Sequence, residues 1–213
     1  MKDYIATIVK NEQIADNVYA VTFDLGETAK VRCGQFGNIS VGGTHLLRRP
    51  IAICKAEGNF VTFCYQVKGE GTQILAAMEK GMTTQVLMPL GNGFFVEEKE
   101  KKVALVGGGV GIFPLISVLR EYAATKEISA YIGYRNKDAV CGVDEFAKAQ
   151  KFVAVTDDGV GFDTNAPIDE KKHVGLRNIR GRLKAMVGGD LILESKPGAG
   201  TRAVIMIPKE VTV

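Results

Sequence analysis

The sequence predicts a mixed fold in three parts: an antiparallel β-barrel, a truncated doubly wound (Rossmann-like) α/β half and a C-terminal helix with a β-hairpin. Short alternating apolar runs with glycine turns fill residues 4–97, as in an antiparallel barrel or sandwich. A continuous apolar strand then meets a glycine run and a helix, which is typical of a buried parallel sheet. After residue 159 the pattern changes again. We therefore place three domains, at residues 1–98, 99–158 and 159–213.

The composition is that of a globular chain. Its 213 residues are 46% hydrophobic and 24% charged, with a net charge of +3 and no Lys/Arg run long enough to make a patch, which argues against a nucleic-acid partner. No stretch reaches the roughly 18–20 apolar residues of a membrane span, and the N-terminus lacks a signal-peptide pattern, so we expect no membrane partner and a cytoplasmic location. The cysteines, Cys33, Cys54, Cys64 and Cys141, lack metal-site spacing and are expected to be small buried or semi-buried thiols.

The barrel strands are predicted from alternation of apolar and polar residues. This alternation is clearest at residues 5–9, 18–25 and 60–67. One helix is expected at 72–80, because Gly71 precedes it and Gly81 ends it.

The α/β half is predicted from an apolar strand at 103–106, a helix at 112–124, a strand at 128–134, a helix at 140–149 and a strand at 152–156. Strand–helix–strand–helix–strand with short loops is one mononucleotide-binding half of a doubly wound sheet. A complete domain of this type would continue for several more strands and helices.

The C-terminal part follows a different pattern. A polar loop leads to an amphipathic helix at 173–186, and strands at 190–195 and 201–207 then flank a glycine-rich turn. This part is predicted to be a helix followed by a hairpin.

The first motif with chemistry is Arg49-Pro50-Ile51-Ala52, followed by Gly69-Glu70-Gly71-Thr72. An arginine fork donates two parallel hydrogen bonds to a diphosphate, and glycine lets backbone approach a ligand. We expect Thr72 to open a helix whose N-terminal amides favour a phosphate. Spacing alone leaves the alternative open, in which the arginines are a solvated face and Gly-x-Gly-Thr is only a turn and a cap.

The second motif is the glycine run between the apolar strand and the next helix. Its glycines are Gly107, Gly108, Gly109 and Gly111. Glycines in this position let the pyrophosphate of a dinucleotide meet the helix N-terminus.

The order of these motifs resembles the ferredoxin-reductase superfamily, and within it the electron transfer subunits of type B dihydroorotate dehydrogenase, over about residues 1–158. The resemblance implies FAD on the barrel, at Arg49, Pro50, Ile51, Ala52, Tyr65, Gln66, Gly71 and Thr72. It implies NAD(H) at Gly107, Gly108, Gly109 and Gly111, with hydride passing to the flavin N5. Ala52 stands where serine is usual, which removes a hydroxyl that could bond the flavin ring.

This resemblance implies an FAD-dependent electron-transfer module of pyrimidine biosynthesis, taking electrons from NADH, with a catalytic dehydrogenase subunit as partner. No side chain of the chain itself is expected to be catalytic. The rest of the nicotinamide domain and the cysteines of the family's iron–sulfur centre do not follow Gly159. We therefore expect weak NAD(H) binding, no iron–sulfur cluster, no metal and a weak diaphorase at most.

The stretch around Asp157, Gly159 and Gly161, with Gly175 further on, resembles the ATP-binding boxes of a sensor histidine kinase ATPase domain over about residues 154–209. The helix carrying that family's magnesium-holding asparagine is absent, so we do not expect ATP to bind. Both resemblances contain Asp-Asp-Gly after a strand, and the chain looks spliced there. An ATP-binding kinase fragment and a non-functional fusion are the alternatives to the electron-transfer reading.

Overall fold

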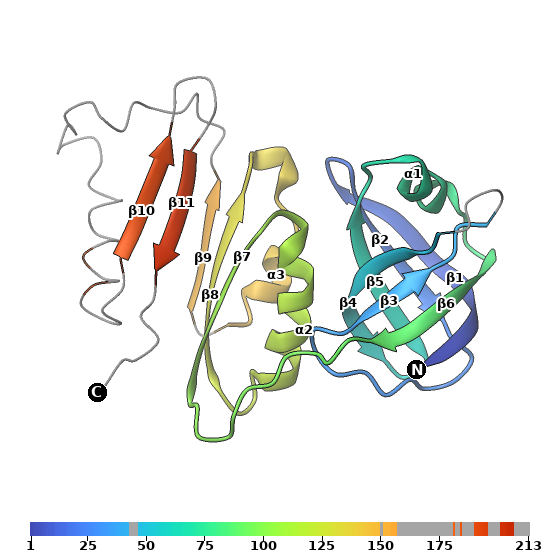
Figure 1. Cartoon of the computed structure of the whole chain (residues 1–213), viewed down its shortest axis with the longest axis horizontal. Helices are drawn as coiled ribbons and strands as arrows, with labels where there is room; N and C mark the ends of the chain where they lie inside the picture. The colour runs from blue at the N-terminus through green and yellow to red at the C-terminus, as the bar shows by residue number, and fades with distance from the viewer. Residues whose placement is uncertain are drawn as a thin grey trace. The chain divides into compact units, whose positions relative to one another are not determined.

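The computed structural model describes residues 1–42, 47–149, 151–156, 181, 184, 190–195 and 201–206 (Figure 1). The chain divides into two compact units, Met1–Thr156 and Asp157–Val213. Within the described residues, no helix has the length and apolar character needed to cross a membrane.

The first unit begins with a closed antiparallel barrel, as predicted. Its strands follow the order β1–β2–β5–β4–β3–β6, and closure leaves no sheet edge to be covered. The elements are β1 (Lys2–Ala15), β2 (Val18–Asp24), β3 (Phe36–Ile39), β4 (Arg49–Glu57), β5 (Phe60–Gln66), α1 (Glu70–Ala77) and β6 (Thr83–Leu90).

The barrel interior is filled by the apolar residues that alternate along the strands. Phe23 of β2 and Phe63 of β5 are fully buried and meet edge to face, with ring centroids 6.0 Å apart. Leu75 of α1 is 0% exposed and joins the same core, so it anchors this short helix to the barrel. The helix begins at Glu70, two residues earlier than predicted, because Gly69 rather than Gly71 is its N-cap.

The α/β half follows the predicted order of elements. It contains β7 (Lys102–Gly108), the 3₁₀ turn η1 (Gly109–Ile112), α2 (Phe113–Tyr122), β8 (Glu127–Tyr134), η2 (Lys137–Ala139), α3 (Val143–Phe146) and β9 (Lys151–Thr156). The three strands pair in parallel in the order β7–β8–β9.

The second predicted helix, at 140–149, is much shorter in the structure. Gly142 takes a left-handed backbone conformation (φ +70°), which cannot continue a right-handed helix, so the chain turns there and α3 starts only at Val143. The sequence prediction of a helix starting at residue 140 was wrong for this reason.

A second apolar core joins the barrel to the α/β half. Its buried members are Val18, Cys33, Cys54, Cys64, Leu105, Ile112, Phe113, Ile116, Val118, Leu119, Ile128, Ala130, Ile132, Tyr134 and Phe146. The two parts of the first unit therefore share a packed interface, in which α2 lies against β4.

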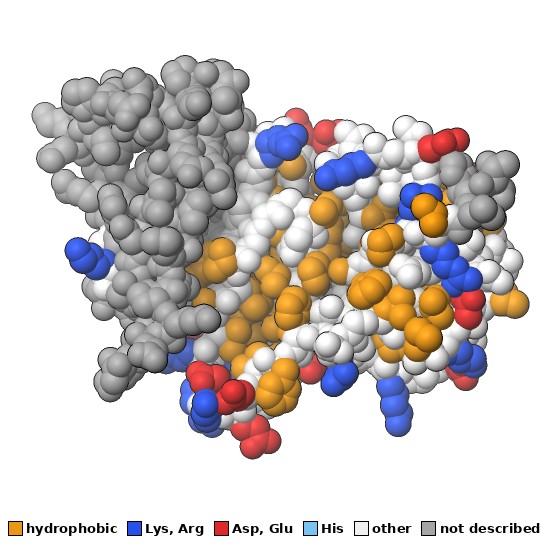
Figure 2. Space-filling model, viewed as in Figure 1, with side chains coloured by type: hydrophobic (Ala, Val, Ile, Leu, Met, Phe, Trp, Pro, Cys, Tyr) orange, Lys and Arg blue, Asp and Glu red, His pale blue; other side chains and the backbone are white. Residues whose placement is uncertain are grey.

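Hydrophobic side chains also remain at the surface of the first unit. Figure 2 shows them gathered across the middle of the viewed face, with most charged side chains toward the margins. The exposed apolar residues include Phe94, Phe95 and Val106, of which Phe95 is 81% exposed. Contiguous apolar surface of this kind is typical of proteins that bind a ligand or partner.

In the second unit, β10 (Asp190–Ser195) and β11 (Thr201–Met206) form an antiparallel pair, as the predicted hairpin requires. Gly181 and Lys184 are helical, within the range of the predicted helix. Hairpins occur in many folds, so the assignment of this unit to an ATPase stays a prediction. Asp157, Gly159, Gly161 and Gly175 lie outside the described residues.

Candidate functional site

The predicted phosphate-binding residues gather at one end of the barrel. Arg49 starts β4 and lies opposite Ile39 of β3. Because β4 and β5 run antiparallel, with Ile53 opposite Phe63, the start of β4 and the end of β5 at Gln66 share that end. The turn into α1 follows directly. Two segments that are distant in sequence are thus brought side by side.

The guanidinium of Arg49 lies against Gly71. A Cβ atom added to Gly71 would lie 2.4 Å from Nε of Arg49 and 2.6 Å from its Cζ, so any larger residue here would have to displace the guanidinium. Nε is buried, and no acceptor for its N–H lies among the described residues. Leaving a buried charged donor unsatisfied is costly, so its geometry suits an anionic acceptor that none of the described residues supplies.

The turn before α1 is held by the hydroxyl of Thr72. Its Oγ1 accepts hydrogen bonds from the amides of Lys68 (2.9 Å) and Gly69 (3.1 Å), and donates one to the carbonyl of Gly69 (2.8 Å). We predicted that Thr72 would open the helix, but it is the third residue of α1 and closes the turn instead. The turn is therefore rigid, and the helix N-terminus beside Arg49 is favourable for negative charge.

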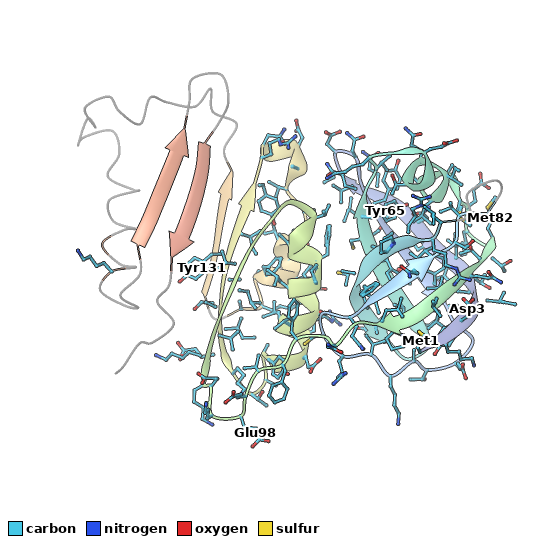
Figure 3. All side chains as sticks on the ribbon, in the orientation of Figure 1. Met1, Asp3, Tyr65, Met82, Glu98 and Tyr131 are labelled. Atoms are coloured by element: carbon cyan, nitrogen blue, oxygen red, sulfur yellow. The ribbon has the colours of Figure 1, made fainter. Side chains whose placement is uncertain are left out.

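Tyr65 and Gln66 differ in their surroundings. Tyr65 is 4% exposed and lies in the barrel near α1 (Figure 3). Its ring stacks on that of Tyr19, with centroids 6.0 Å apart. Burial raises the pKa of the Tyr65 hydroxyl, which donates to Oδ1 of Asn11 at 3.4 Å. Gln66, the next residue, is half-buried. The end of β5 thus presents Gln66 to a ligand more readily than Tyr65.

The glycine run has two functions in the structure. Gly107 and Gly108 are needed for packing, because added Cβ atoms would lie 2.7 Å from Leu115 and 3.3 Å from the carbonyl of Gly133. Gly109, with φ +54°, and Gly111 face open space, since an added Cβ would meet no atom within 4 Å. Only the second pair leaves room for a ligand.

The two predicted sites are neighbours. The turn η1, which carries Gly109 and Gly111, lies against β5 as well as β7 and β8. The candidate nicotinamide loop is therefore next to the strand that ends in Gln66.

The sequence analysis did not identify Asn11 and Gln35 as important residues. Asn11 Nδ2 donates to the carbonyls of Leu75 (2.9 Å) and Met78 (2.9 Å) and so holds the end of α1. Gln35 is 7% exposed, a rare burial for a polar side chain in the described chain, and fixes the turn before β3. Asn11 lies between Lys10 and Glu12, and Gln35 between Gly34 and Phe36, so neither position carries a distinctive sequence signal.

The cysteines are free thiols, and Cys33, Cys54 and Cys64 are buried, which confirms the prediction of buried thiols. Burial, and then the nearby Glu121 carboxylate, raise the pKa of Cys33 to about 12. Among the described residues, no group of His, Cys, Asp and Glu could hold a metal ion.

The fold and the site together define a class of protein. An antiparallel barrel followed by a parallel α/β half is the fold of ferredoxin-reductase-type flavoproteins. The structure of an NADH-dependent reduced ferredoxin–NADP oxidoreductase is 28% identical, with a TM-score of 0.64, over 71% of this chain and 56% of that one. Phthalate dioxygenase reductase, at 19% identity, shares the fold with a TM-score of 0.65 over 80% of this chain and 56% of that one.

Sequence relatives narrow the class. The dihydroorotate dehydrogenase B electron transfer subunit of Fusobacterium nucleatum is 37% identical over 171 residues, which are 76% of this chain and 66% of the relative. That of Desulforamulus reducens is 30% identical over 228 residues, covering 96% of this chain and 87% of the relative. No protein-family model matches. The chain belongs to the family of dihydroorotate dehydrogenase B electron transfer subunits, and it spans just under two thirds of the Fusobacterium relative.

Proposed function

We propose that the chain is an FAD-dependent electron-transfer module that takes electrons from NADH and passes them to a catalytic dehydrogenase subunit. The observation that carries this proposal is the buried Nε of Arg49, held over Gly71 without an acceptor among the described residues. A dinucleotide diphosphate supplies the oxygens that this donor lacks. FAD held by these residues would supply the hydride and electron-transfer chemistry.

The proposed FAD site consists of Arg49, Pro50, Ile51, Ala52, Gln66, Gly71 and Thr72, with Tyr65 behind it in the barrel core. Arg49 binds the diphosphate, Gly71 leaves space for the guanidinium and Thr72 keeps the turn in shape. Ala52 has a methyl group in place of a hydroxyl, so its side chain would offer no hydrogen bond to a bound flavin.

The proposed NAD(H) site is the loop of Gly109 and Gly111 at the end of β7. Its support is the open space at both glycines and the position of η1 against β5. Gly107 contributes by letting Leu115 of α2 pack closely beneath the loop, and Gly108 by letting β7 approach Gly133 of β8.

We also propose that residues 159–213 derive from a sensor-histidine-kinase-type ATPase domain joined at the Thr156–Gly159 segment. Support comes from the resemblance of the glycine boxes and from the division of the chain into compact units after Thr156. Equilibrium binding of a fluorescent ATP analogue tests whether nucleotide binding survives, and we expect none. Sequencing reads across the codons for Thr156–Gly161 test the join.

The proposed FAD site is tested by titrating the purified chain with FAD and comparing two substitutions. Arg49→Lys keeps the charge but loses the planar fork, so we expect FAD binding to weaken at least about tenfold, or about 1.4 kcal/mol. Arg48→Lys is the matched control, because Arg48 is engaged by both oxygens of Asp3 at 2.8 and 2.7 Å. Equal FAD affinities for the two variants would contradict the assignment.

A further inference from the structure

The turn from Arg32 to Gln35 connects several elements of the first unit. Oε1 of Gln35 accepts from the amide of Arg32 (2.9 Å), and Nε2 donates to the carbonyl of Gly91 (2.8 Å) after β6. The amide of Ile53 in β4 donates to the carbonyl of Gln35 at 2.9 Å. The turn is therefore fixed to the barrel on two sides.

Helix α2 holds the same turn from the α/β side. The amide of Cys33 donates to Oε2 of Glu121 at 2.9 Å, and the amide of Gly34 donates to Oγ of Ser117 at 3.0 Å. The Ser117 hydroxyl in turn donates to the carbonyl of Pro114 at 2.6 Å. This bond fixes the hydroxyl proton, so the oxygen lone pairs are left to accept from the Gly34 amide. Ser117 and Glu121 are four residues apart and so lie on one face of the helix.

The local chemistry favours these two hydrogen bonds. A carboxylate that accepts from a backbone amide makes a stronger bond than a neutral acceptor does. Cys33 stays protonated beside Glu121, because burial and then that carboxylate raise its pKa to about 12. Gly34 has φ +76°, and an added Cβ would lie 2.3 Å from the ring of Phe94, so this conformation of the turn favours glycine at position 34.

We infer that Ser117 and Glu121 are positioning residues that set the distance between the glycine loop and the barrel end of the site. Helix α2 follows directly on η1, which carries Gly109 and Gly111. The turn at Arg32–Gln35 leads directly into β3, where Phe36 lies opposite Ala52. Apolar packing of α2 brings the parts together but is non-directional. The two directed hydrogen bonds define how far the helix can slide or turn on the barrel.

The first test needs no cofactor and uses hydrogen–deuterium exchange of the full chain without FAD. In Ser117→Ala combined with Glu121→Ala, we expect the amides at 32–36 to exchange about tenfold faster and the loop at 107–112 to exchange faster with them. Glu121→Gln keeps an acceptor oxygen and should restore most of the protection at Cys33. Thr125→Ala is the control. Thr125 lies beyond the end of α2, and its hydroxyl contacts the carbonyl of Tyr122, the last residue of that helix, rather than the turn at 32–35.

Faster exchange confined to 32–36, or no change at either segment, would overturn the inference. Should the double variant not fold, Ser117→Ala alone makes the same comparison, because it removes the one hydrogen bond from Ser117 to the turn, together with its bond to Pro114, and no buried apolar group. Its exchange at 107–112 must then rise for the inference to hold.

The second test concerns catalysis and rests on the proposed function. We expect the double variant to keep its FAD affinity while anaerobic flavin reduction by NADH slows at least about tenfold, since misplaced reactants lose rate steeply. Reduction by dithionite, which needs no nicotinamide site, should be unchanged. An unaltered NADH rate contradicts the positioning role. If the unsubstituted chain binds no FAD, the proposed function fails while the exchange measurement still decides the inference.

Discussion

At Gly71 the backbone passes directly beneath the guanidinium of Arg49. The sequence motif predicted both residues, since an arginine before Pro-Ile and a Gly-x-Gly-Thr turn are local patterns. It could not predict that they touch, because 22 positions separate them and only the pairing of β4 with β5 brings them together. Asn11 and Gln35 were missed for a related reason. Their partners are backbone carbonyls and amides, which carry no side-chain signature.

Gly71→Ala is expected to push the Arg49 guanidinium aside, because the new Cβ would lie 2.4 Å from Nε. We predict that FAD binding weakens at least about tenfold in an absorbance titration, while the far-UV circular dichroism is unchanged. Gly69→Ala is a matched control in the same turn. It adds the same methyl group where no atom lies within 4 Å, with φ −152°, and should bind FAD normally. Equal losses in both variants would show that the contact with Arg49 is irrelevant.

The stability of the chain should fall in alkaline solution because of Cys33. In the unfolded chain the pKa of a cysteine thiol is about 8.5. In the folded chain, burial and then Glu121 raise the pKa of Cys33 to about 12. The folded state keeps a proton that the unfolded state loses, so this stability is present in full below about pH 8.5 and declines as the pH rises toward about 12. Urea unfolding at several pH values should show a shallower decline in Cys33→Ala. The same slope in both proteins would contradict the account.

At the scale of elements, the sequence predicted the order of the α/β elements, the barrel helix and three of the six barrel strands, β1, β2 and β5, whereas β3, β4 and β6 were not predicted individually. Alternation and apolar runs are local signals, and they were sufficient for the class of the barrel and for the parallel strands. The predicted range of the second α/β helix, 140–149, was too long. A glycine at position 142 does not by itself reveal a positive φ, so the start of the helix could not be placed from the sequence. The start of α1 was misplaced because two candidate cap glycines, Gly69 and Gly71, lie two residues apart.

Asn11→Asp should loosen α1 from the barrel. The amide of Asn11 donates to the carbonyls of Leu75 and Met78, and a carboxylate would leave both unsatisfied and place negative charge at the helix C-terminus. We expect the free energy of unfolding to drop by about 1–3 kcal/mol in urea titrations. Gln13→Glu makes the same change on the exposed part of β1, where the amide contacts Ala15, and should cost little. A stable Asn11→Asp variant would exclude this role.

At the scale of the whole molecule, the barrel, the α/β half and the candidate site residues all lie in the first unit, Met1–Thr156. The barrel and the α/β half share one apolar core, so the distance between the two proposed cofactor sites is a property of that joint packing. The sequence predicted both parts but not their interface, whose members come from elements up to about 130 positions apart. The second unit is described through its hairpin, and its origin remains the proposal made above.

Ile116→Ala should destabilise both parts of the first unit together. Ile116 is buried in the shared core, and large-to-small substitutions at such positions cost about 2–5 kcal/mol. We expect near-UV circular dichroism and tyrosine fluorescence to report one common, earlier transition of the first unit. Val110→Ala, at a partly exposed site of η1, should have a small effect. Separate transitions for the barrel and the α/β half would contradict a common core.

The central claim is that FAD on the barrel accepts electrons from NADH at the glycine loop. It is tested most directly by an anaerobic NADH titration of the chain after loading with FAD and desalting. We predict a flavin band near ~450 nm that bleaches as NADH is added and returns on exposure to air. A chain that stays colourless after FAD loading, or a flavin band that NADH leaves unchanged, would contradict the account.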